Sequence, residues 1–294
     1  MVEEIITLEN DDVRVQVMAH HGGRVTHLIN QRDEREWLIG PRAVDTTPPR
    51  LDDVYTDTNH FGWDEMLPTI DPCQYPGEPY SDLALADHGE LWTALWEVIG
   101  RGPTSLHQRV EGQRMKYVFE RVLELRGAVL RCEYRCVTPV DTAMLWALHP
   151  QFVTRDATRL QLHPEPVAVL DTSRATPRVR DWPGDLIVER DIVSGSDLMI
   201  YVDPMVAVES ASLLDADGSS LTMTWDRRFA RYLGIWADHG RHSVGRVIAI
   251  EPTNSFYDDL SKAVAHRRST LFAANQPLTW WVEIALQSAK VSPA

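Results

Sequence analysis

The stretch Tyr117–Val137, YVFERVLELRGAVLRCEYRCV, decides the fold class of this chain. The runs Tyr117–Leu125 and Ala128–Val137 are rich in apolar residues interspersed with charged ones, and Arg126-Gly127 lies between them. From Leu130 to Cys136 apolar and charged side chains strictly alternate. Alternation with a period of two is typical of strands that bury one face, and a glycine between two such runs is typical of a tight turn. The stretch therefore predicts two strands joined at Arg126-Gly127.

Similar strand patterns recur along the chain, whereas helix patterns are scarce. Val13, Val15 and Val17 alternate with polar residues, and one helix is expected over Tyr257–His266, where Leu260 and Val264 form a short apolar stripe. Many short strands with turns rich in Gly, Pro, Asp and Asn favour an all-β fold, a large antiparallel sandwich. The other predicted strands lie in Met144–Leu148, Leu186–Glu189, Met199–Val202, Leu221–Trp225, Tyr232–Trp236, Val247–Glu251 and Thr279–Leu286.

No repeat or linker divides the sequence, so we expect a single domain over residues 1–294. The segment Arg42–Asp87 differs from the rest because it is rich in proline and lacks regular periodicity. Long irregular connections in compact domains are typically functional or disordered, and the aromatic content of this one speaks against disorder. We expect it to fold over one face of the sandwich and to form a wall of a binding cleft.

The composition excludes several classes of partner. The 43 acidic residues outnumber the 29 basic ones, giving a formal net charge of -14. Such a chain repels nucleic-acid phosphates and anionic lipid surfaces. The N-terminal residues do not have the pattern of a signal peptide, and no apolar run approaches membrane-spanning length, so a cytoplasmic location is expected.

The cysteines are expected to be reduced. Cys132 and Cys136 lie four residues apart in one predicted strand, which separates their Cα atoms by roughly 13 Å. This separation is well beyond the reach of a disulfide. Nothing in the sequence around Cys73 marks it as a nucleophile.

Three short motifs supply a candidate acid/base set. His88 lies in Asp87–Trp92, His149 in Leu148-His149-Pro150 and Glu251 in Ile250-Glu251-Pro252. Histidine gives or takes a proton near neutral pH, and a glutamate among apolar neighbours is a better base than one in water. Taken singly, each of these residues is more commonly structural, and it is their combination that indicates chemistry.

These motifs, together with Gly22-Gly23-Arg24-Val25, resemble in their order those of the aldose 1-epimerases (galactose mutarotases) and their relatives. The likeness covers most of the chain. It implies the large antiparallel β-supersandwich of the galactose mutarotase group and an isomerase that interconverts the α and β anomers of an aldose without a cofactor or metal. It also implies that Glu251 is the base, His149 the acid and His88 an assisting residue.

The sequence departs from the family pattern at positions that contact the sugar. The family's His-Gly-Gly becomes His88-Gly89-Glu90, and its Asn-Arg pair has only Asn59-His60 as a loose counterpart. The Asp that holds sugar hydroxyls in the family has two candidate counterparts, Asp226 and Asp238. We therefore expect a conserved acid/base centre with altered substrate recognition, and the identity of the sugar stays open.

The remaining candidates concern substrate binding. Aromatic rings stack on the apolar face of a sugar, and four tryptophans lie near the candidate motifs in sequence: Trp63, Trp92, Trp146 and Trp236. The predicted substrate-binding set is Trp63, Asn59, Trp92, Trp236, Asp238 and Arg231. In an alternating strand Arg227 and Arg231 would share a face, so a sugar phosphate is an alternative substrate, although a solvated strand or turn is the stronger interpretation.

Other interpretations remain open at this stage. The chain could be a carbohydrate-binding protein that lacks turnover, a hexose-6-phosphate mutarotase, or a lyase or glycoside hydrolase. The last would need a pair of carboxylates or a Tyr/His base positioned across a glycosidic bond. His20, His21 and His27 match no standard zinc spacing, so no metal site is expected. The expected partner is a small sugar, and the sequence leaves the oligomeric state undetermined.

Overall fold

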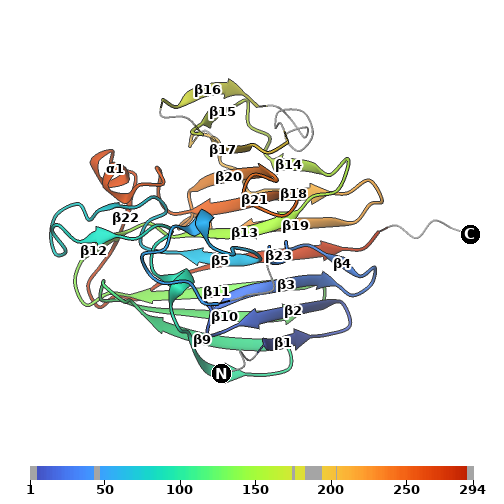
Figure 1. The fold of residues 1–294 in the computed structure, drawn as a ribbon, viewed down its shortest axis with the longest axis horizontal. Coiled ribbons are helices and arrows are strands. Elements are labelled where there is room, and N and C mark those ends of the chain that lie inside the picture. The colour runs from blue at the N-terminus through green and yellow to red at the C-terminus, as the bar shows by residue number, and fades with distance from the viewer. Residues whose placement is uncertain (1–4, 43–46, 174–175, 183–193, 203, 290–294) are drawn as a thin grey trace, which may run out of the picture.

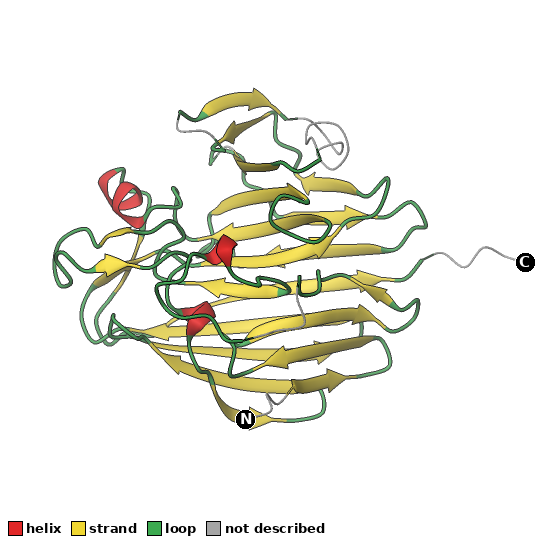
Figure 2. Ribbon diagram, in the orientation of Figure 1, coloured by secondary structure: helices red, strands yellow, loops and turns green. Residues whose placement is uncertain are grey.

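Antiparallel strands form almost the entire fold, as the sequence predicts. The computed structural model describes residues 5–42, 47–173, 176–182, 194–202 and 204–289. Strands β10 (Val118–Arg126) and β11 (Val129–Val137) pair in the predicted hairpin, with Leu125 opposite Leu130. The predicted large antiparallel sandwich is confirmed (Figures 1 and 2).

The larger sheet contains eleven described strands, and its centre carries the candidate site. Its adjacent strands pair antiparallel, and β4 (Arg35–Glu36) is attached to β3. The order across the sheet is β1 (Ile5–Glu9), β2 (Val13–Met18), β3 (Arg24–Asn30), β5 (Trp63–Met66), β13 (Ala147–Val153), β21 (Arg246–Thr253), β20 (Tyr232–His239), β17 (Asp197–Val202), β15 (Ala168–Asp171) and β16 (Arg178–Asp181).

The second sheet contains eight described strands and covers one face of the first. Its order is β14 (Arg159–His163), β18 (Ser210–Leu214), β19 (Ser220–Trp225), β23 (Leu278–Gln287), β11, β10, β9 (Ser105–Glu111) and β8 (Glu97–Arg101). The smaller elements are the pair β12 (Thr142–Met144) and β22 (Thr270–Phe272), the pair β6 (Cys73–Gln74) and β7 (Ala84–Leu85), helix α1 (Leu260–Ala265), and the 3₁₀ turns η1 (Tyr55–Asp57) and η2 (Leu91–Thr93).

The core lies between the two sheets, and strand alternation determines which side chains enter it. Phe119 and Leu123 of β10 lie opposite Cys136 and Cys132 of β11, and all four side chains are fully buried. Burial raises the pKa of both buried thiols, so they remain protonated and unreactive. Both cysteines are free, as is Cys73.

Several local predictions need correction. The run Met144–Leu148 is not one strand, because β12 ends at Met144 and β13 begins at Ala147. Residues 227–229 form a turn, in which Asp226 O accepts the N–H groups of Phe229 and Ala230, so Arg227 and Arg231 do not share a strand face. The predicted helix begins only at Leu260, because Asp259 accepts the N–H of Lys262 and caps it. The predicted strand Leu186–Glu189 lies outside the described residues.

The irregular segment Arg42–Asp87 contributes both a strand and loops. Its strand β5 is inserted between β3 and β13 of the larger sheet, while η1 lies in a loop over the outer face of that sheet. Tyr55, Thr56, His60, Ile70 and Asp71 of this segment line a cleft there. Within the described part of the chain, no helix is long and apolar enough to cross a membrane.

Candidate active site

The outer face of the larger sheet presents the predicted catalytic side chains because of strand alternation. On β13 and β21, Leu148 and Ile250 point into the core between the sheets. His149 and Glu251 follow them in sequence and therefore point to the opposite face, where they line the cleft. Trp236 of β20 lines the same cleft.

The strand register aligns the site residues in a row across the sheet. Asp64 of β5 lies opposite His149, and Glu251 lies opposite Gly234 of β20. Gly234 in turn lies opposite Tyr201 of β17. Residues far apart in the sequence are therefore neighbours in one line perpendicular to the strands.

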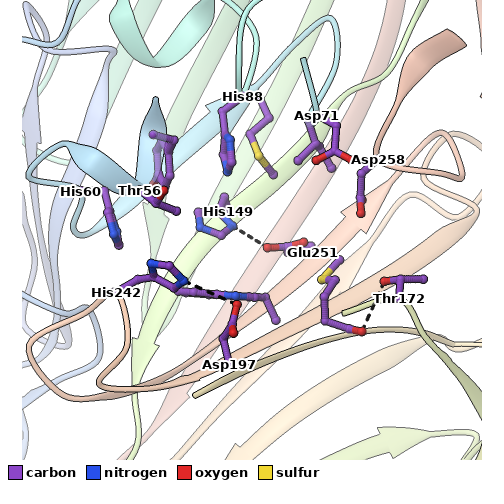
Figure 3. Close-up of a pocket in the computed structure, with 15 residues that line it drawn as sticks. Thr56, His60, Asp71, His88, His149, Thr172, Asp197, His242, Glu251 and Asp258 are labelled. Carbon is purple, nitrogen blue, oxygen red and sulfur yellow. Dashed lines mark hydrogen bonds and ion pairs between the residues drawn. The ribbon is translucent and has the colours of Figure 1, made fainter. Parts of the chain in front are cut away.

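The cleft has a volume of about 260 Å³ and brings together His88, His149 and Glu251 (Figure 3). Pockets for drug-sized ligands typically measure roughly 300–1,000 Å³. A cleft slightly below that range fits a small molecule such as a monosaccharide better than an extended chain.

His149 and Glu251 form a buried pair at the centre of the cleft. His149 Nδ1 lies 2.5 Å from Glu251 Oε1, and both side chains are nearly inaccessible to solvent. The contact occupies Nδ1 and leaves Nε2 for a bound molecule. Within the described residues, Glu251 Oε2 has no hydrogen-bond partner, so the pair offers one carboxylate oxygen and one ring nitrogen for proton transfer.

The glycine at position 234 makes room for the Glu251 carboxylate. A Cβ atom on this residue would lie 3.2 Å from Glu251 Oε2 and 2.9 Å from Met199 Cε. Either contact would force a neighbouring side chain to move. Gly234 thus permits the glutamate to keep the orientation in which it meets His149.

His88 reaches the cleft from a loop. Its Nδ1 lies 2.8 Å from Asp87 Oδ1, and its ring stacks on Tyr55 with centroids 4.0 Å apart and an interplanar angle of 4°. The His88 and His149 rings are 5.7 Å apart in a T-shaped arrangement. Hydrogen bonding to His88 and to backbone N–H groups outweighs burial and lowers the pKa of Asp87, which keeps this carboxylate charged beside the imidazole.

The residues after His88 fix the loop. Gly89 has φ +73°, and a Cβ there would lie 2.1 Å from the carbonyl oxygen of Leu67. Glu90 turns away from the cleft and accepts the backbone N–H of Gln113 at 2.6 Å. Glu90 therefore anchors a neighbouring loop and does not line the cleft.

Tyr55 is the centre of a buried polar network beneath the two histidines. Its hydroxyl donates to Asp64 Oδ2 at 2.9 Å, and Arg24 donates to both oxygens of Asp64 at 2.8 and 2.9 Å. Burial, followed by the charge of Asp64, raises the pKa of Tyr55 well above its ordinary value, so the phenol remains protonated. The network holds Tyr55 rigidly against His88.

The opposite side of the cleft is acidic. Asp71 and Asp258 lie together there in Figure 3, and Tyr201 OH donates to Asp258 Oδ1. Burial, with a further contribution from the charge of Asp71, raises the pKa of Asp258 to about 7. Asp258 therefore exchanges a proton near neutral pH within the same cleft as Glu251.

Of the predicted substrate-binding residues, Trp236 lines the cleft, half-buried. Trp63 and Trp92, like Trp146, are fully buried and do not line the cleft. Asn59 is one residue away from a cleft position: its side chain accepts the N–H of Arg42 and its carbonyl accepts from Arg24.

Asp238 and Arg231 also lie outside the cleft lining. Asp238 is fully buried and accepts the backbone N–H groups of Arg241, His242 and Ser243, so it shapes the turn that carries His242 to the cleft. Arg231 is exposed and lies over the Tyr232 ring at 5.8 Å. Asp226, the other predicted aspartate, binds the side chain of Arg228.

Sequence reasoning missed several residues of the cleft. Tyr55, His60, Asp71, Asp197 and Asp258 all line it. The aromatic content of Arg42–Asp87 indicated a wall but not which of its residues form it. The two aspartates Asp197 and Asp258 had no signal, because isolated carboxylates are common on any surface.

The described residues include no group of three or more His, Cys, Asp or Glu side chains placed to hold a metal ion.

Comparisons with known proteins place the fold. No protein-family model matches the sequence. No curated protein matches it either. Among solved structures, a protein from Synechocystis sp. PCC 6803 is 17% identical with a TM-score of 0.78, covering 97% of this chain and 96% of its own.

Two further solved structures carry functional descriptions. A galactose mutarotase related enzyme from Lactobacillus acidophilus is 14% identical with a TM-score of 0.72, covering 97% of this chain and 98% of its own. A galactose mutarotase-like protein from Lactobacillus casei ATCC 334 is 17% identical with a TM-score of 0.73, covering 97% of this chain and 100% of its own. The chain therefore has the galactose mutarotase-like fold, shared over nearly its whole length with proteins of that group.

Proposed function

We propose that this protein is a cofactor-free aldose 1-epimerase that interconverts the α and β anomers of an uncharged aldose. The observation that supports it most is the pairing of His149 with Glu251 at 2.5 Å in an open cleft that His88 also lines. A base and an acid at one centre are what anomer exchange requires.

The mechanism needs only two proton transfers. Glu251 Oε2 takes the proton of the C1 hydroxyl while protonated His149 gives the Nε2 proton to the ring oxygen. The bond between C1 and the ring oxygen breaks and an open-chain aldehyde forms. Rotation about C1–C2 presents the other carbonyl face, and the reverse transfers close the ring as the other anomer. Each general acid or base typically contributes 10²–10⁴-fold to the rate.

His88 and Trp236 are suited to hold the sugar. Asp87 engages Nδ1 of His88, which leaves Nε2 for a sugar oxygen next to His149. The Trp236 ring lies 5.5 Å from the His149 ring and offers a flat apolar surface against a sugar face.

The charge of the cleft favours a neutral substrate over a sugar phosphate. Four carboxylate side chains line it, those of Asp71, Asp197, Glu251 and Asp258, and none of the described lining residues is Arg or Lys. A phosphate dianion would enter a site of its own sign without a guanidinium to hold it. The hexose-6-phosphate alternative is therefore the less favoured one.

An exchange experiment tests the proposal. Anomer exchange is measured by NMR for a panel of free aldoses and their 6-phosphates, with His149→Asn as the inactive reference and Glu283→Gln, a variant on the other sheet, as the matched control. We expect exchange above the buffer rate for at least one free aldose, unchanged in Glu283→Gln and lost in His149→Asn. Sugar binding without exchange would instead identify a carbohydrate-binding protein.

A further inference from the structure

His60 is a buried residue of the cleft with one unused polar atom. It is 1% exposed, yet it lines the cleft. Figure 3 shows it on the left side of the view, with His149 between it and the acidic residues Asp71 and Asp258. Its Nδ1 lies 3.0 Å from Gln151 Oε1, whereas its Nε2 has no hydrogen-bond partner within the described residues.

A chain of hydrogen bonds determines which ring nitrogen of His60 carries the hydrogen. It starts at Arg24, which can only donate and which donates to both carboxylate oxygens of Asp64. A carboxylate in such a pair only accepts, so the hydrogen between Tyr55 and Asp64 belongs to the Tyr55 hydroxyl. Because that hydroxyl has a single hydrogen, its oxygen must accept the next bond in the chain.

The next donor is the amide of Gln151, whose Nε2 lies 3.2 Å from Tyr55 OH. This fixes the amide orientation and directs Oε1 toward His60 Nδ1 and toward Ser243 Oγ, 3.4 Å away. An amide oxygen accepts only, so His60 Nδ1 carries a hydrogen and donates it.

His60 does not carry a second hydrogen on its ring at neutral pH. Burial lowers its pKa to about 4, and the nearby His149 and Arg24 act in the same direction. The ring is therefore neutral, and Nε2 presents a bare lone pair. A buried acceptor without a partner is costly, so its preservation in a cleft points to a ligand that donates to it.

We propose that His60 sets the specificity of the cleft by accepting, at Nε2, a hydrogen bond from one hydroxyl group of an uncharged sugar. The proposal rests on the proposed function for the nature of the ligand. The hydroxyl is the matching donor, whereas the oxygens of a phosphate dianion would repel the lone pair. A sugar that lacks this hydroxyl leaves Nε2 unpaired and binds more weakly.

The first experiment is nitrogen-15 NMR of the histidine rings, which needs neither sugar nor turnover. The His60 signals are assigned by their loss in His60→Gln. We expect a neutral ring with the hydrogen on Nδ1 at pH 7. Tyr55→Phe removes the hydroxyl that orients Gln151, and we expect the other tautomer to appear in that variant. A His60 ring that is charged at pH 7, or that carries its hydrogen on Nε2, would overturn the proposal.

The second experiment compares sugar binding by calorimetry in the wild type, His60→Leu and His60→Gln, with His107→Leu on the other sheet as the matched control. The panel contains the aldose that binds and its monodeoxy analogues. We expect His60→Leu to lower the affinity for the parent aldose about tenfold, because the variant loses a hydrogen bond with a buried partner. One monodeoxy analogue should bind to the wild type about tenfold more weakly than the parent aldose. The affinity for this analogue should not fall further in His60→Leu.

The outcomes separate the two proposals. An equal loss for every sugar, or no loss, would overturn the role of His60 while anomer exchange by the wild type still supports the epimerase. Sugar binding with the expected deoxy pattern but without exchange would support His60 and contradict the epimerase. Retained affinity in His60→Gln, whose amide supplies an acceptor, would support the hydrogen bond over a purely structural role.

Discussion

Two buried glutamates on opposite faces of the same sheet show how this protein separates stability from chemistry. Glu65 of β5 points between the sheets, where Oε1 accepts from Arg121 at 3.1 Å and from Tyr134 at 3.0 Å, and Oε2 accepts from Trp146 at 3.0 Å. Glu251 of β21 points to the cleft, and its described hydrogen bonding is limited to the contact of Oε1 with His149.

The difference lies in how completely each carboxylate is satisfied. Both of them are almost fully buried. Both oxygens of the interior glutamate accept hydrogen bonds, which would have to break before it could react. Two of its donors, Arg121 and Tyr134, belong to the second sheet, so these bonds link the two sheets. The cleft glutamate keeps one oxygen available, at the cost of a polar atom that the fold does not satisfy. Buried charge alone thus does not indicate function, whereas incomplete hydrogen bonding in a cleft does.

The largest expected effect is on the cleft glutamate. Glu251→Gln keeps the shape of the side chain but removes its basicity, so anomer exchange should fall roughly 10²–10⁴-fold. Exchange NMR at saturating sugar measures the turnover, and calorimetry should show that sugar binding is largely preserved. Near-wild-type exchange in this variant would remove Glu251 from the mechanism.

The interior glutamate should instead affect folding. Glu65→Ala leaves Arg121 buried without its carboxylate, which typically costs about 3–5 kcal/mol in the free energy of unfolding. Urea denaturation measures this loss. The control is Glu124→Ala, which breaks the exposed ion pair with Arg126 and should lower the free energy of unfolding by under about 1 kcal/mol. Equal losses in the two variants would contradict the structural role of Glu65.

His60 offers a pH-dependent test of the cleft. Because burial lowers its folded-state pKa to about 4 from an ordinary value of 6.5, the unfolded chain binds a proton that the folded chain does not between these values. The wild type should therefore lose stability, on the order of 2 kcal/mol, as the pH falls from 6.5 to 4.

The His60→Gln variant lacks this proton linkage, so its stability relative to the wild type should rise as the pH falls through that range. Urea denaturation at several pH values gives the difference in the free energy of unfolding between the two proteins. The effects of the carboxylates, which both proteins share, cancel in this difference. Parallel curves for the two proteins would show that folding does not lower the pKa of His60.

The smallest expected effect concerns Gly234. Gly234→Ala places a methyl group 3.2 Å from Glu251 Oε2, which should displace the carboxylate and lower turnover about tenfold. Stability should fall by only about 1 kcal/mol, because the closest atom, Met199 Cε, is the end of a flexible chain.

The matched control is Gly100→Ala on edge strand β8, where the added atom would meet His107 Cβ at an ordinary 3.4 Å. Turnover in this control should equal that of the wild type. If Gly234→Ala also had the turnover of the wild type, Glu251 would tolerate displacement of its carboxylate.

Local patterns in the sequence predicted the strands, and the motifs that resemble those of the aldose 1-epimerases pointed to the acid/base residues. The hairpin over Tyr117–Val137 was predictable because alternation and a glycine turn are local signals. The same alternation placed His149 and Glu251 on one face of their strands. Their roles as acid and base stay predictions, but their convergence in one cleft follows from the register of β13 with its neighbours.

Substrate recognition was much less predictable. Trp63 and Trp236 both lie in predicted strand or cleft segments, yet one is fully buried and the other lines the cleft. Asn59 was predicted as a sugar contact, whereas the structure brings its neighbour His60 to the cleft. Asn59 and His60 lie in a loop, where no periodic pattern predicts which side chain enters the cleft, and only the packing of neighbouring elements decides it.

The sequence by itself determined the all-β class and the Tyr117–Val137 hairpin, because period-two patterning and turn chemistry are local properties. Its resemblance to the aldose 1-epimerases also pointed to two histidines and one glutamate as candidates for proton transfer. Only the tertiary structure decided which buried carboxylate is fully hydrogen-bonded and which keeps a free oxygen. It also decided that His60 lines the cleft while its Nε2 has no hydrogen-bond partner within the described residues. Both outcomes depend on partners far apart in the chain, such as Arg24, Tyr55 and Gln151, which strand register and loop packing bring into contact.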